Sequence, residues 1–245
     1  MKVTDEVMQI LDRSQTKDSA LFLPSEQLGR STYLAVNQVL AAAGGTWNRK
    51  ARAHLFPGDA AEAIEPILMT GEVVRAQDFG YFPTPTPVVE EMLSLAELEA
   101  GHLVLEPSAG RGAIAHRVAE FCSVNCIELL EENAKALTAA GLVRSVEVGD
   151  FLEIDPEPRY DRVLMNPPFA KQADIAHVRH ALKFLRPGGL LVSVMSAGVT
   201  FRSNRATADF RDLVDELGGT ITRLPDDAFK ESGTGVRTVL VAIVV

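Results

Sequence analysis

Short apolar runs alternate with helical patterns from residue 103 onwards, and this alternation limits the fold more than any other feature of the sequence. Strands joined through helices run parallel with right-handed crossovers, so the pattern predicts an α/β fold with a mostly parallel sheet. The last two runs have no helix between them, which predicts an antiparallel hairpin at one sheet edge. The predicted strands cover 103–105, 123–127, 146–148, 161–165, 190–195, 221–224 and 238–245. The predicted helices cover 113–121, 131–140 and 174–185, and a turn is predicted at 186–189.

Three prolines alternate with other residues at 83, 85 and 87, and they predict an extended connector. Proline lacks a backbone donor and clashes with the preceding turn, so three prolines in alternation are not expected inside a helix or a central strand. The connector separates a small helix-rich N-terminal region, residues 1–80, from a domain over residues 81–245. Within the first region a helix is expected over about 27–43.

The charge balance is acidic, with 24 Lys and Arg against 33 Asp and Glu and a net charge of -9. Such a chain has no general field to attract nucleic acid, so nucleic-acid binding requires a local basic patch. The polar start and the short apolar runs predict a cytoplasmic protein that does not enter a membrane. Cys122 and Cys126 are expected to be reduced thiols, and the histidine spacing predicts no metal site.

A glycine-containing loop joins the first predicted strand to the next helix and reads Glu106-Pro107-Ser108-Ala109-Gly110-Arg111-Gly112. Its two glycines let the backbone approach a ligand where a Cβ would intrude, and the helix N-terminus beyond them is polar. The third glycine of the dinucleotide-binding fingerprint is replaced by Ala115. The alternative interpretation is a tight strand-to-helix turn that binds nothing.

Acidic side chains stand at the ends of the next two predicted strands. Glu128 lies 18 residues after Gly110, where a carboxylate can accept hydrogen bonds from both hydroxyls of a ribose. Asp150 and Phe151 follow the third strand, where they can bind an adenine amino group and cover the ring. Each acid alone is typical of a solvated loop. Ligands of open parallel sheets bind at carboxyl strand ends, so the set predicts a bound adenosine moiety.

These features resemble the class I S-adenosylmethionine-dependent methyltransferases, whose Rossmann-like sheet carries the loop pattern seen from Glu106 to Gly112. The resemblance implies S-adenosyl-L-methionine as the cofactor. It also implies that Glu106 lies close to the amino group of the cofactor's methionine, through backbone or water contacts. The cofactor-binding residues expected here are Glu106, Pro107, Ser108, Ala109, Gly110, Gly112, Glu128, Asp150 and Phe151.

The tetrapeptide Asn166-Pro167-Pro168-Phe169 directly follows the fourth predicted strand. An amino group conjugated to a base is a weak nucleophile, and two acceptors aimed at its N–H bonds would localise its lone pair. The Asn166 side-chain oxygen and the Pro167 carbonyl can be these acceptors, held in place by the prolines. Phe169 can stack on an extruded base, worth about 1–3 kcal/mol. The alternative is a structural turn with Phe169 in the core.

Asn-Pro-Pro followed by an aromatic residue resembles amino-group methyltransferases that act on adenine N6, guanine N2 of RNA or a glutamine amide. A Thr-Pro segment, then the glycine loop, then this motif is the order of the gamma group of DNA adenine-N6 methyltransferases. In that group the threonine holds the cofactor's methionine carboxylate, which implies this role for Thr84 and a cofactor contact for Asn166. The similarity also implies that Phe229, in a late loop, helps to hold the flipped base.

One departure from the gamma group concerns target recognition. Those enzymes usually carry a large recognition region after the catalytic half, whereas only 76 residues follow Phe169 here and the predicted sheet uses nearly all of them. Sequence-specific recognition of DNA would therefore come from a separate specificity subunit or from the N-terminal region.

A basic segment with the only tryptophan follows the predicted helix at 27–43. Trp47, Arg49, Lys50 and Arg52 suit phosphate contact and base stacking, so they are predicted substrate-binding residues. The alternative is a Gly-Gly helix stop and a solvated edge strand, with Trp47 in the core.

The leading functional hypothesis is methylation of adenine N6 in DNA, with S-adenosyl-L-methionine as methyl donor. An RNA base methyltransferase, acting on adenine N6 or guanine N2, is the first alternative because the chain is compact. A glutamine-amide methyltransferase and a non-catalytic cofactor-binding module are the further alternatives.

Overall fold

The computed structural model describes residues 1–73 and 82–245. Residues 82–245, called here the sheet unit, form a seven-stranded sheet in the order β10-β11-β9-β8-β5-β6-β7. All neighbours are parallel except β11, which is antiparallel to both β9 and β10. The predicted α/β fold and its antiparallel edge hairpin are therefore confirmed. The strands are β5 Leu103–Glu106, β6 Ser123–Glu128, β7 Ser145–Val148, β8 Tyr160–Met165, β9 Leu185–Ser196, β10 Thr220–Arg223 and β11 Thr238–Val244.

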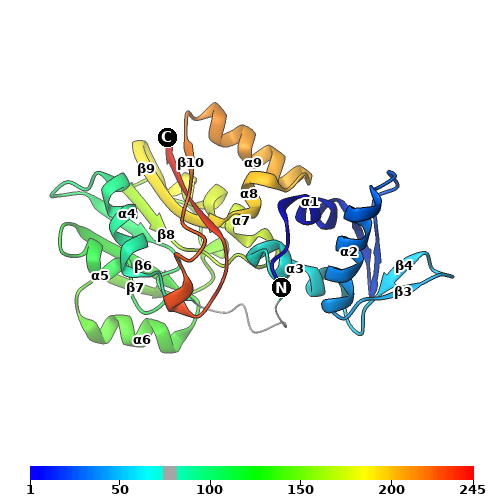
Figure 1. The fold of residues 1–245 in the computed structure, drawn as a ribbon. Helices are drawn as coiled ribbons and strands as arrows, with labels where there is room; N and C mark the ends of the chain where they lie inside the picture. The colour runs from blue at the N-terminus through cyan, green and yellow to red at the C-terminus, as the bar shows by residue number, and fades with distance from the viewer. Residues whose placement is uncertain (74–81) are drawn as a thin grey trace.

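Helices cover both faces of this sheet (Figure 1). One hydrophobic core lies between the sheet and α4, α5 and α6, and the other between the sheet and α7 and α9. Neighbouring residues of one strand alternate between the cores, as Val104 and Leu105 do, because successive side chains of a strand point to opposite faces. The helices are α4 Thr86–Ala96, α5 Ala115–Val118, α6 Glu131–Ala140, α7 Ala173–Ala181, α8 Gly198–Phe201 and α9 Arg205–Glu216.

Three predicted boundaries differ from the structure. The regular part of α5 is shorter than 113–121, although helical hydrogen bonds continue on both sides of it. The helix expected at 174–185 ends as a 3-10 turn, η3 Leu182–Phe184. The turn expected at 186–189 lies inside β9 as a bulge, because Leu185 pairs with Tyr160 and Leu190 with Arg162.

The proline-rich connector is shorter than predicted. Thr86 and Pro87 already belong to α4, with Pro85 as the residue before the helix. A proline is tolerated there because the first-turn N–H groups of a helix have no partner within the helix. The exclusion of proline from helix interiors therefore does not apply to Pro87.

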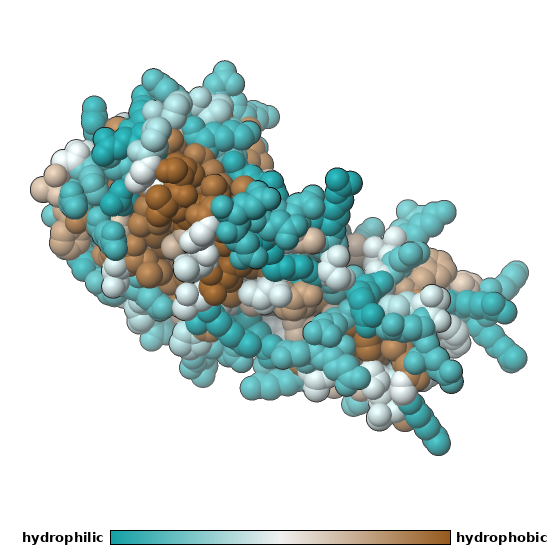
Figure 2. Space-filling view, turned by 90° about the horizontal axis from the view of Figure 1, so that it is seen from above, coloured by the Kyte–Doolittle hydropathy of each residue, from teal (hydrophilic) through white to brown (hydrophobic). Residues whose placement is uncertain are grey.

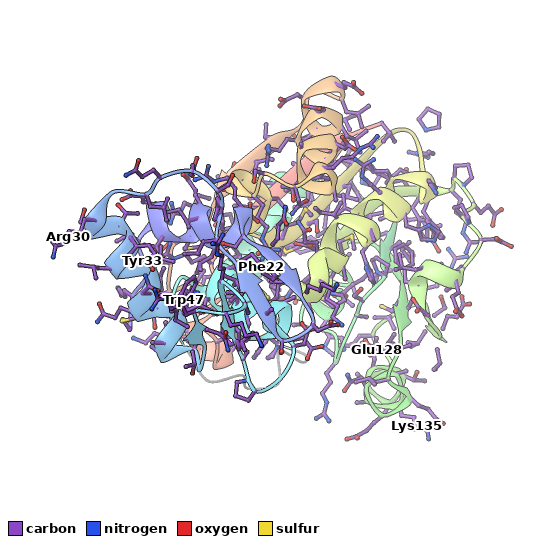
Figure 3. All side chains as sticks on the ribbon, turned by 90° about the vertical axis from the view of Figure 1, so that its right-hand side faces the viewer. Phe22, Arg30, Tyr33, Trp47, Glu128 and Lys135 are labelled. Atoms are coloured by element: carbon purple, nitrogen blue, oxygen red, sulfur yellow. The ribbon has the colours of Figure 1, made fainter. Side chains whose placement is uncertain are left out.

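Residues 1–73, called here the N-terminal unit, have a core of their own, with Leu11, Leu21, Leu40 and Ile67 fully buried. The helices are α1 Asp5–Arg13, α2 Arg30–Ala42 and α3 Ala60–Thr70, and α2 lies where a helix was predicted. The sequence did not predict the small antiparallel sheet β1-β2-β4-β3. Its strands are only three residues long: β1 Gln15–Lys17, β2 Ala20–Phe22, β3 Thr46–Asn48 and β4 Ala53–Leu55. Figure 3 shows this unit beside the part of the sheet unit that carries Glu128 and Lys135.

A buried ion cluster joins the two units. It consists of Asp12 and Glu65 of the N-terminal unit with Asp174 and Arg202 of the sheet unit. Arg202 is 5% exposed, and its Nη2 donates to Glu65 Oε1 over 3.0 Å. Its Nε lies 4.0 Å from Asp12 Oδ1, and Asp12 Oδ2 accepts from the Ser203 backbone N–H. Charged groups are buried at a cost unless they are paired, so this cluster fixes how the units meet.

Seen from above, hydrophobic residues gather over the sheet unit, and hydrophilic residues cover most of the N-terminal unit (Figure 2). Within residues 1–73 and 82–245, no helix is both long enough and apolar enough to cross a membrane.

Arg202→Ala is expected to lower the free energy of unfolding by about 3 kcal/mol, because it leaves buried carboxylates without their cation. Urea denaturation measures this loss. Arg13→Ala is the matched control, since Arg13 pairs with Glu26 at the surface and its loss is expected to change stability by less than about 0.5 kcal/mol. Equal losses in the two variants would contradict the assigned role of Arg202.

Candidate active site

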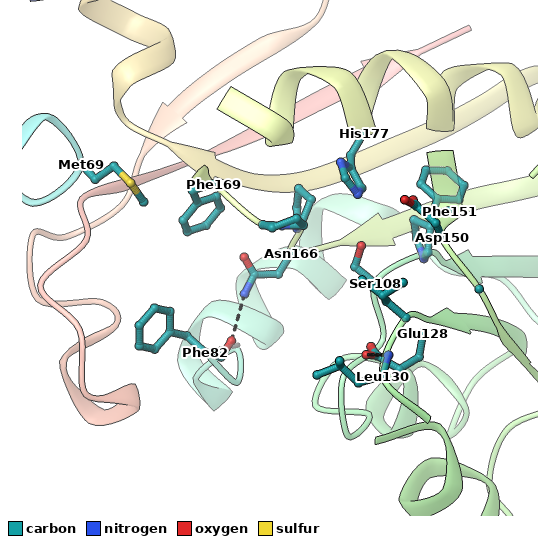
Figure 4. A pocket seen from close by; sticks show the side chains of 15 residues that line it. Met69, Phe82, Ser108, Glu128, Leu130, Asp150, Phe151, Asn166, Phe169 and His177 are labelled. Atoms are coloured by element: carbon teal, nitrogen blue, oxygen red, sulfur yellow. Dashed lines mark hydrogen bonds between the residues drawn. The ribbon is translucent and has the colours of Figure 1, made fainter. Parts of the chain in front are cut away.

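A cavity of about 290 Å³ opens at the carboxyl ends of the parallel strands (Figure 4). Loops after β5, β6, β7 and β8 all contribute to its wall, so predicted residues from four separate segments come together. Its volume lies near the lower end of the range for small-molecule sites. The lining residues are Met69, Phe82, Pro107, Ser108, Glu128, Leu129, Leu130, Gly149, Asp150, Phe151, Asn166, Pro167, Pro168, Phe169 and His177.

Glu128 fixes the glycine loop beside the cavity. Its Oε2 accepts from the Gly110 backbone N–H over 2.6 Å, and its Oε1 accepts from the Leu130 N–H over 2.8 Å. Each carboxylate oxygen keeps a second acceptor site, so ribose hydroxyls can still bind. Gly112 has φ 91°, and a Cβ there would lie 2.5 Å from Leu137 Cδ1, so this position requires glycine.

Glu106 is buried beside the loop with an unsatisfied oxygen. It is 2% exposed, and its Oε2 has no hydrogen-bond partner. Burial raises the pKa of Glu106 well above its ordinary value, the Ala115 backbone N–H opposes this, and the nearby Glu128 carboxylate raises it further. A second, smaller cavity joins Glu106 to Thr84 and Asn166. Glu106 and Glu128 line the smaller and the larger cavity respectively, and a cationic group bound beside Glu106 would favour its ionised form.

Asn166 presents one polar atom without a partner. Its amide Nδ2 donates to Thr84 Oγ1 over 3.0 Å and to the Phe82 carbonyl over 3.5 Å (Figure 4). The Phe82 carbonyl oxygen can only accept a hydrogen bond, so the amide atom that faces it must be the nitrogen Nδ2 and not the oxygen. The Oδ1 atom is buried and has no partner in the structure. A buried acceptor of this kind is costly unless a ligand supplies a donor.

Phe169 serves both the core and the cavity. It is 9% exposed, belongs to the hydrophobic core over α4, and also lines the cavity, so part of the structural alternative holds for its ring. The loop that follows contains Lys171 and Gln172 with φ 55° and 60°, strained values for residues with a Cβ. Gln172 Nε2 donates to Thr207 Oγ1, and Gln172 Oε1 accepts from Asn204 Nδ2, which hold this loop.

Comparison with known proteins assigns the family. Residues 91–213, half of the chain, match the methyltransferase small domain family. The chain belongs to this family. Residues 91–213 therefore form a methyltransferase domain.

The relatives show the same fold at low identity. The type I restriction enzyme StySPI methylase subunit of Salmonella potsdam is 23% identical over 71% of this chain and 42% of that protein. A modification subunit of a putative type I restriction enzyme from Vibrio vulnificus has a TM-score of 0.57 at 21% identity, over 69% of this chain and 45% of that chain. A putative class I S-adenosylmethionine-dependent methyltransferase from Listeria monocytogenes has a TM-score of 0.56 at 12% identity, over 69% of this chain and 62% of that chain. The methyltransferase thus spans less than half the length of the curated relative.

Asp150 and Phe151 lie at the methyltransferase's cavity but also have structural contacts. Asp150 Oδ1 accepts from the Leu152 backbone N–H over 2.9 Å and caps the 3-10 helix η1 Phe151–Glu153. Phe151 is 3% exposed and packs against His180 and Phe184. Its ring therefore contributes an edge of the cavity rather than an open face.

The structure buries one of the predicted substrate contacts and exposes another. Phe229 is 1% exposed inside the core of the methyltransferase, so its ring offers no face to a base. Trp47 is 47% exposed on the edge strand β3, so the alternative is right about a solvated edge strand and wrong in placing Trp47 in the core. The hairpin β3–β4, which carries Trp47, Arg49, Lys50 and Arg52, lies at the far end of the N-terminal unit and does not line the cavity (Figure 1).

The sequence did not identify several cavity residues. Met69 comes from α3 of the N-terminal unit, and His177 from the first turns of α7. Leu129 and Leu130 are more than half exposed at the rim. Leu129 and Leu130 could have been predicted, because residues that follow a ligand-binding residue at a strand end tend to line the same cavity. No local sequence pattern predicted that Met69 lines the cavity. Among the described residues there is no group of three or more His, Cys, Asp or Glu side chains suited to a metal ion.

The buried Asp174 is expected to make stability depend on pH. It is 1% exposed, and burial raises its pKa from 3.8 to about 7, although the Ser196 and Ile175 N–H groups and Arg202 oppose the shift. A carboxyl with a raised folded-state pKa stabilises the fold fully at low pH, and this contribution is lost as pH rises from about 4 to 7. The loss is up to about 1.4 kcal/mol per pH unit.

Asp174→Asn removes this titration. The unfolding free energy of the wild type, relative to the variant, is therefore expected to fall between pH 4 and pH 7 in urea denaturation. Asp155→Asn, at an exposed loop position, is the control and should run parallel to the wild type. A constant difference between wild type and Asp174→Asn would show that Asp174 ionises normally.

Proposed function

We propose that this methyltransferase methylates N6 of adenine in DNA. The observation that carries the proposal is the Asn166 amide, whose Nδ2 is held by Thr84 and Phe82 while its Oδ1 is buried without a partner. An exocyclic amino group supplies the donor that Oδ1 lacks. The Pro167 carbonyl accepts the second N–H, and Pro168 restricts the loop that carries both acceptors. Phe169 then packs against the base from the cavity wall.

The cofactor residues follow from the two buried acids. Bound S-adenosyl-L-methionine supplies an activated methyl group on a sulfonium. Glu106 lies at the smaller cavity beside Thr84, which suits the ammonium and carboxylate of the methionine end. Glu128 and Asp150 line the larger cavity, which suits ribose and adenine, and Pro107, Ser108 and Ala109 form the loop between the two ends. The residues expected to bind the cofactor are thus those predicted from the sequence, with Phe151 at the edge.

DNA is favoured by the names of two relatives, a methylase subunit and a modification subunit of type I restriction enzymes. The segment after Phe169 forms α7 to β11 of the sheet unit, which leaves no separate recognition region within it. We therefore propose that a specificity subunit or the N-terminal region, residues 1–80, selects the DNA for a catalytic domain over residues 81–245. An RNA base is the second candidate, because RNA methylation would need no such recognition region.

Nucleoside mass spectrometry tests the substrate. The protein is incubated with methyl-labelled cofactor and either unmethylated DNA or RNA, and the products are digested to nucleosides. Label in N6-methyladenine from DNA is the expected result. Label confined to RNA nucleosides would reject the DNA assignment in favour of the second candidate.

Asn166→Ala is expected to abolish methyl transfer while the affinity for the cofactor changes less than about tenfold, or 1.4 kcal/mol. The reason is that the variant removes an acceptor used by the substrate amino group. Asn166→Asp keeps an oxygen at this position but loses the donor to Phe82, so it should retain partial activity. Single-turnover transfer and calorimetry measure the two effects. Full activity of the alanine variant would remove Asn166 from the mechanism.

Glu106→Gln and Glu128→Ala are each expected to weaken cofactor binding at least tenfold by calorimetry. The first removes a carboxyl group that can ionise beside the cationic ligand, and the second removes ribose contacts together with the bond to Gly110. Glu147→Gln, on the exposed edge strand β7, is the matched control and should bind within about twofold of the wild type. Equal affinity in all three variants would refute the proposed cofactor roles.

A further inference from the structure

The charges of this chain are strongly segregated. Residues 27–58 contain no Asp or Glu and carry four cations, Arg30, Arg49, Lys50 and Arg52. The remainder of the chain has 20 Lys and Arg against 33 Asp and Glu. A polyanion is therefore repelled by most of the surface and attracted to the part that these four residues occupy.

The cations come from α2 and from the turn of the hairpin β3–β4, two elements joined by the contact between Asn37 and His54, and their exposed surface is called here the α2–hairpin face. Figure 3 shows Arg30, Tyr33 and Trp47 on the same side of the N-terminal unit. Tyr33, Leu34 and Trp47 are 41%, 59% and 47% exposed. Within residues 1–73 and 82–245, none of the four cations has an ion pair or a side-chain hydrogen bond, whereas most other arginines do. The face consists of Arg30, Tyr33, Leu34, Trp47, Arg49, Lys50 and Arg52.

The exposed Trp47 ring is linked to α2 through His54 and Asn37. Asn37 Nδ2 donates to the Tyr33 carbonyl over 2.7 Å, and Asn37 Oδ1 lies 2.8 Å from His54 Nε2. The His54 ring, which is 2% exposed, contacts the Trp47 ring at 5.1 Å between centroids. This chain of contacts links α2 to β4 and β3. It keeps the tryptophan at the surface instead of letting it fold into the core.

The hairpin tip is also fixed. Asn48 Oδ1 accepts from the backbone N–H groups of Lys50 and Ala51 over 3.0 and 2.9 Å, and Arg52 has φ 54°. A tip of defined shape loses less conformational freedom when it binds. Unpaired cations on such a tip, next to exposed aromatic rings, have the composition of a surface that contacts phosphates and bases.

We propose that the α2–hairpin face binds the DNA backbone outside the target base. The inference rests on the proposed function for the identity of the nucleic acid. It extends that function because this face lies apart from the cavity and fixes where the flanking DNA runs. The charge segregation favours a polyanion over an acidic protein, since phosphates repeat along the chain and the four cations have no ion pair within the described residues.

Salt-dependent binding tests the proposal with the full chain and a fluorescent 30-base-pair duplex. Arg49→Ala/Lys50→Ala is expected to lower affinity at least tenfold at 100 mM salt, and to reduce the slope of log K against log salt by about 2, because each lost phosphate contact removes about 0.9. Arg144→Ala/Lys183→Ala removes two exposed cations from the sheet unit and is the matched control. It should keep the wild-type slope. Trp47→Ala should weaken binding with little change of slope.

Equal slopes for the two double variants would overturn the proposal, and this is the result expected if the face binds a protein instead. Failure of the proposed function gives a different pattern. If DNA binds through this face but gains no methyl group, the face is confirmed and the methylation of DNA is rejected. If DNA is methylated with the same KM by both double variants, the methylation of DNA stands and the face is rejected. The expected result is a raised KM and unchanged kcat for the α2–hairpin variant alone.

Discussion

The Glu128 carboxylate is the contact on which the geometry of the site depends. It ends β6 and binds the Gly110 N–H of the loop after β5, so one side chain fixes the spacing between two neighbouring strand ends. It also accepts from Leu130, which directs the chain into α6. Because Glu128 lines the cavity as well, any ligand bound there meets a wall whose backbone is already held in position. Preorganisation of this kind reduces the rearrangement that binding requires.

Two unsatisfied buried acceptors complement that fixed wall. Glu106 and Asn166 both line the smaller cavity. Within the described residues, neither Glu106 Oε2 nor Asn166 Oδ1 has a hydrogen-bond partner. A carboxylate favours a cation and an amide oxygen favours a neutral hydrogen-bond donor, so the two atoms suit ligand groups of different kinds. The N-terminal unit takes part through Met69, and Arg202, at the end of α8, pairs with Glu65 of that unit.

The features predicted from the sequence are those encoded by local pattern. Continuous apolar runs identified the parallel strands, and the strand ends placed Glu106, Glu128, Asp150 and Asn166 at one edge of the sheet. The three-residue strands of the N-terminal unit are too short to show a period of two. Burial of Phe229 depends on a loop packing across the sheet, which no local pattern encodes.

Long-range pairing accounts for the rest of what was missed. Asn166 and Thr84 are separated by 82 residues, and Arg202 and Glu65 by 137, so neither partner can be read from its own surroundings. The motif order suggested that Thr84 binds the cofactor, but its hydroxyl also orients the Asn166 amide. The hydrogen bond between Thr84 and Asn166 can be recognised only from the folded structure, in which the two residues lie side by side.

The buried Arg202 has a consequence for how this protein can be recombined with others. Its partners Asp12 and Glu65 come from one unit and Arg202 itself from the other. A chimera of this N-terminal unit with the sheet unit of another protein would leave Asp12 and Glu65 without the cation that pairs with them. A chimera of this sheet unit with another N-terminal unit would leave the Arg202 guanidinium without these two acids. A functional exchange of either unit therefore requires that Asp12, Glu65 and Arg202 are transferred together.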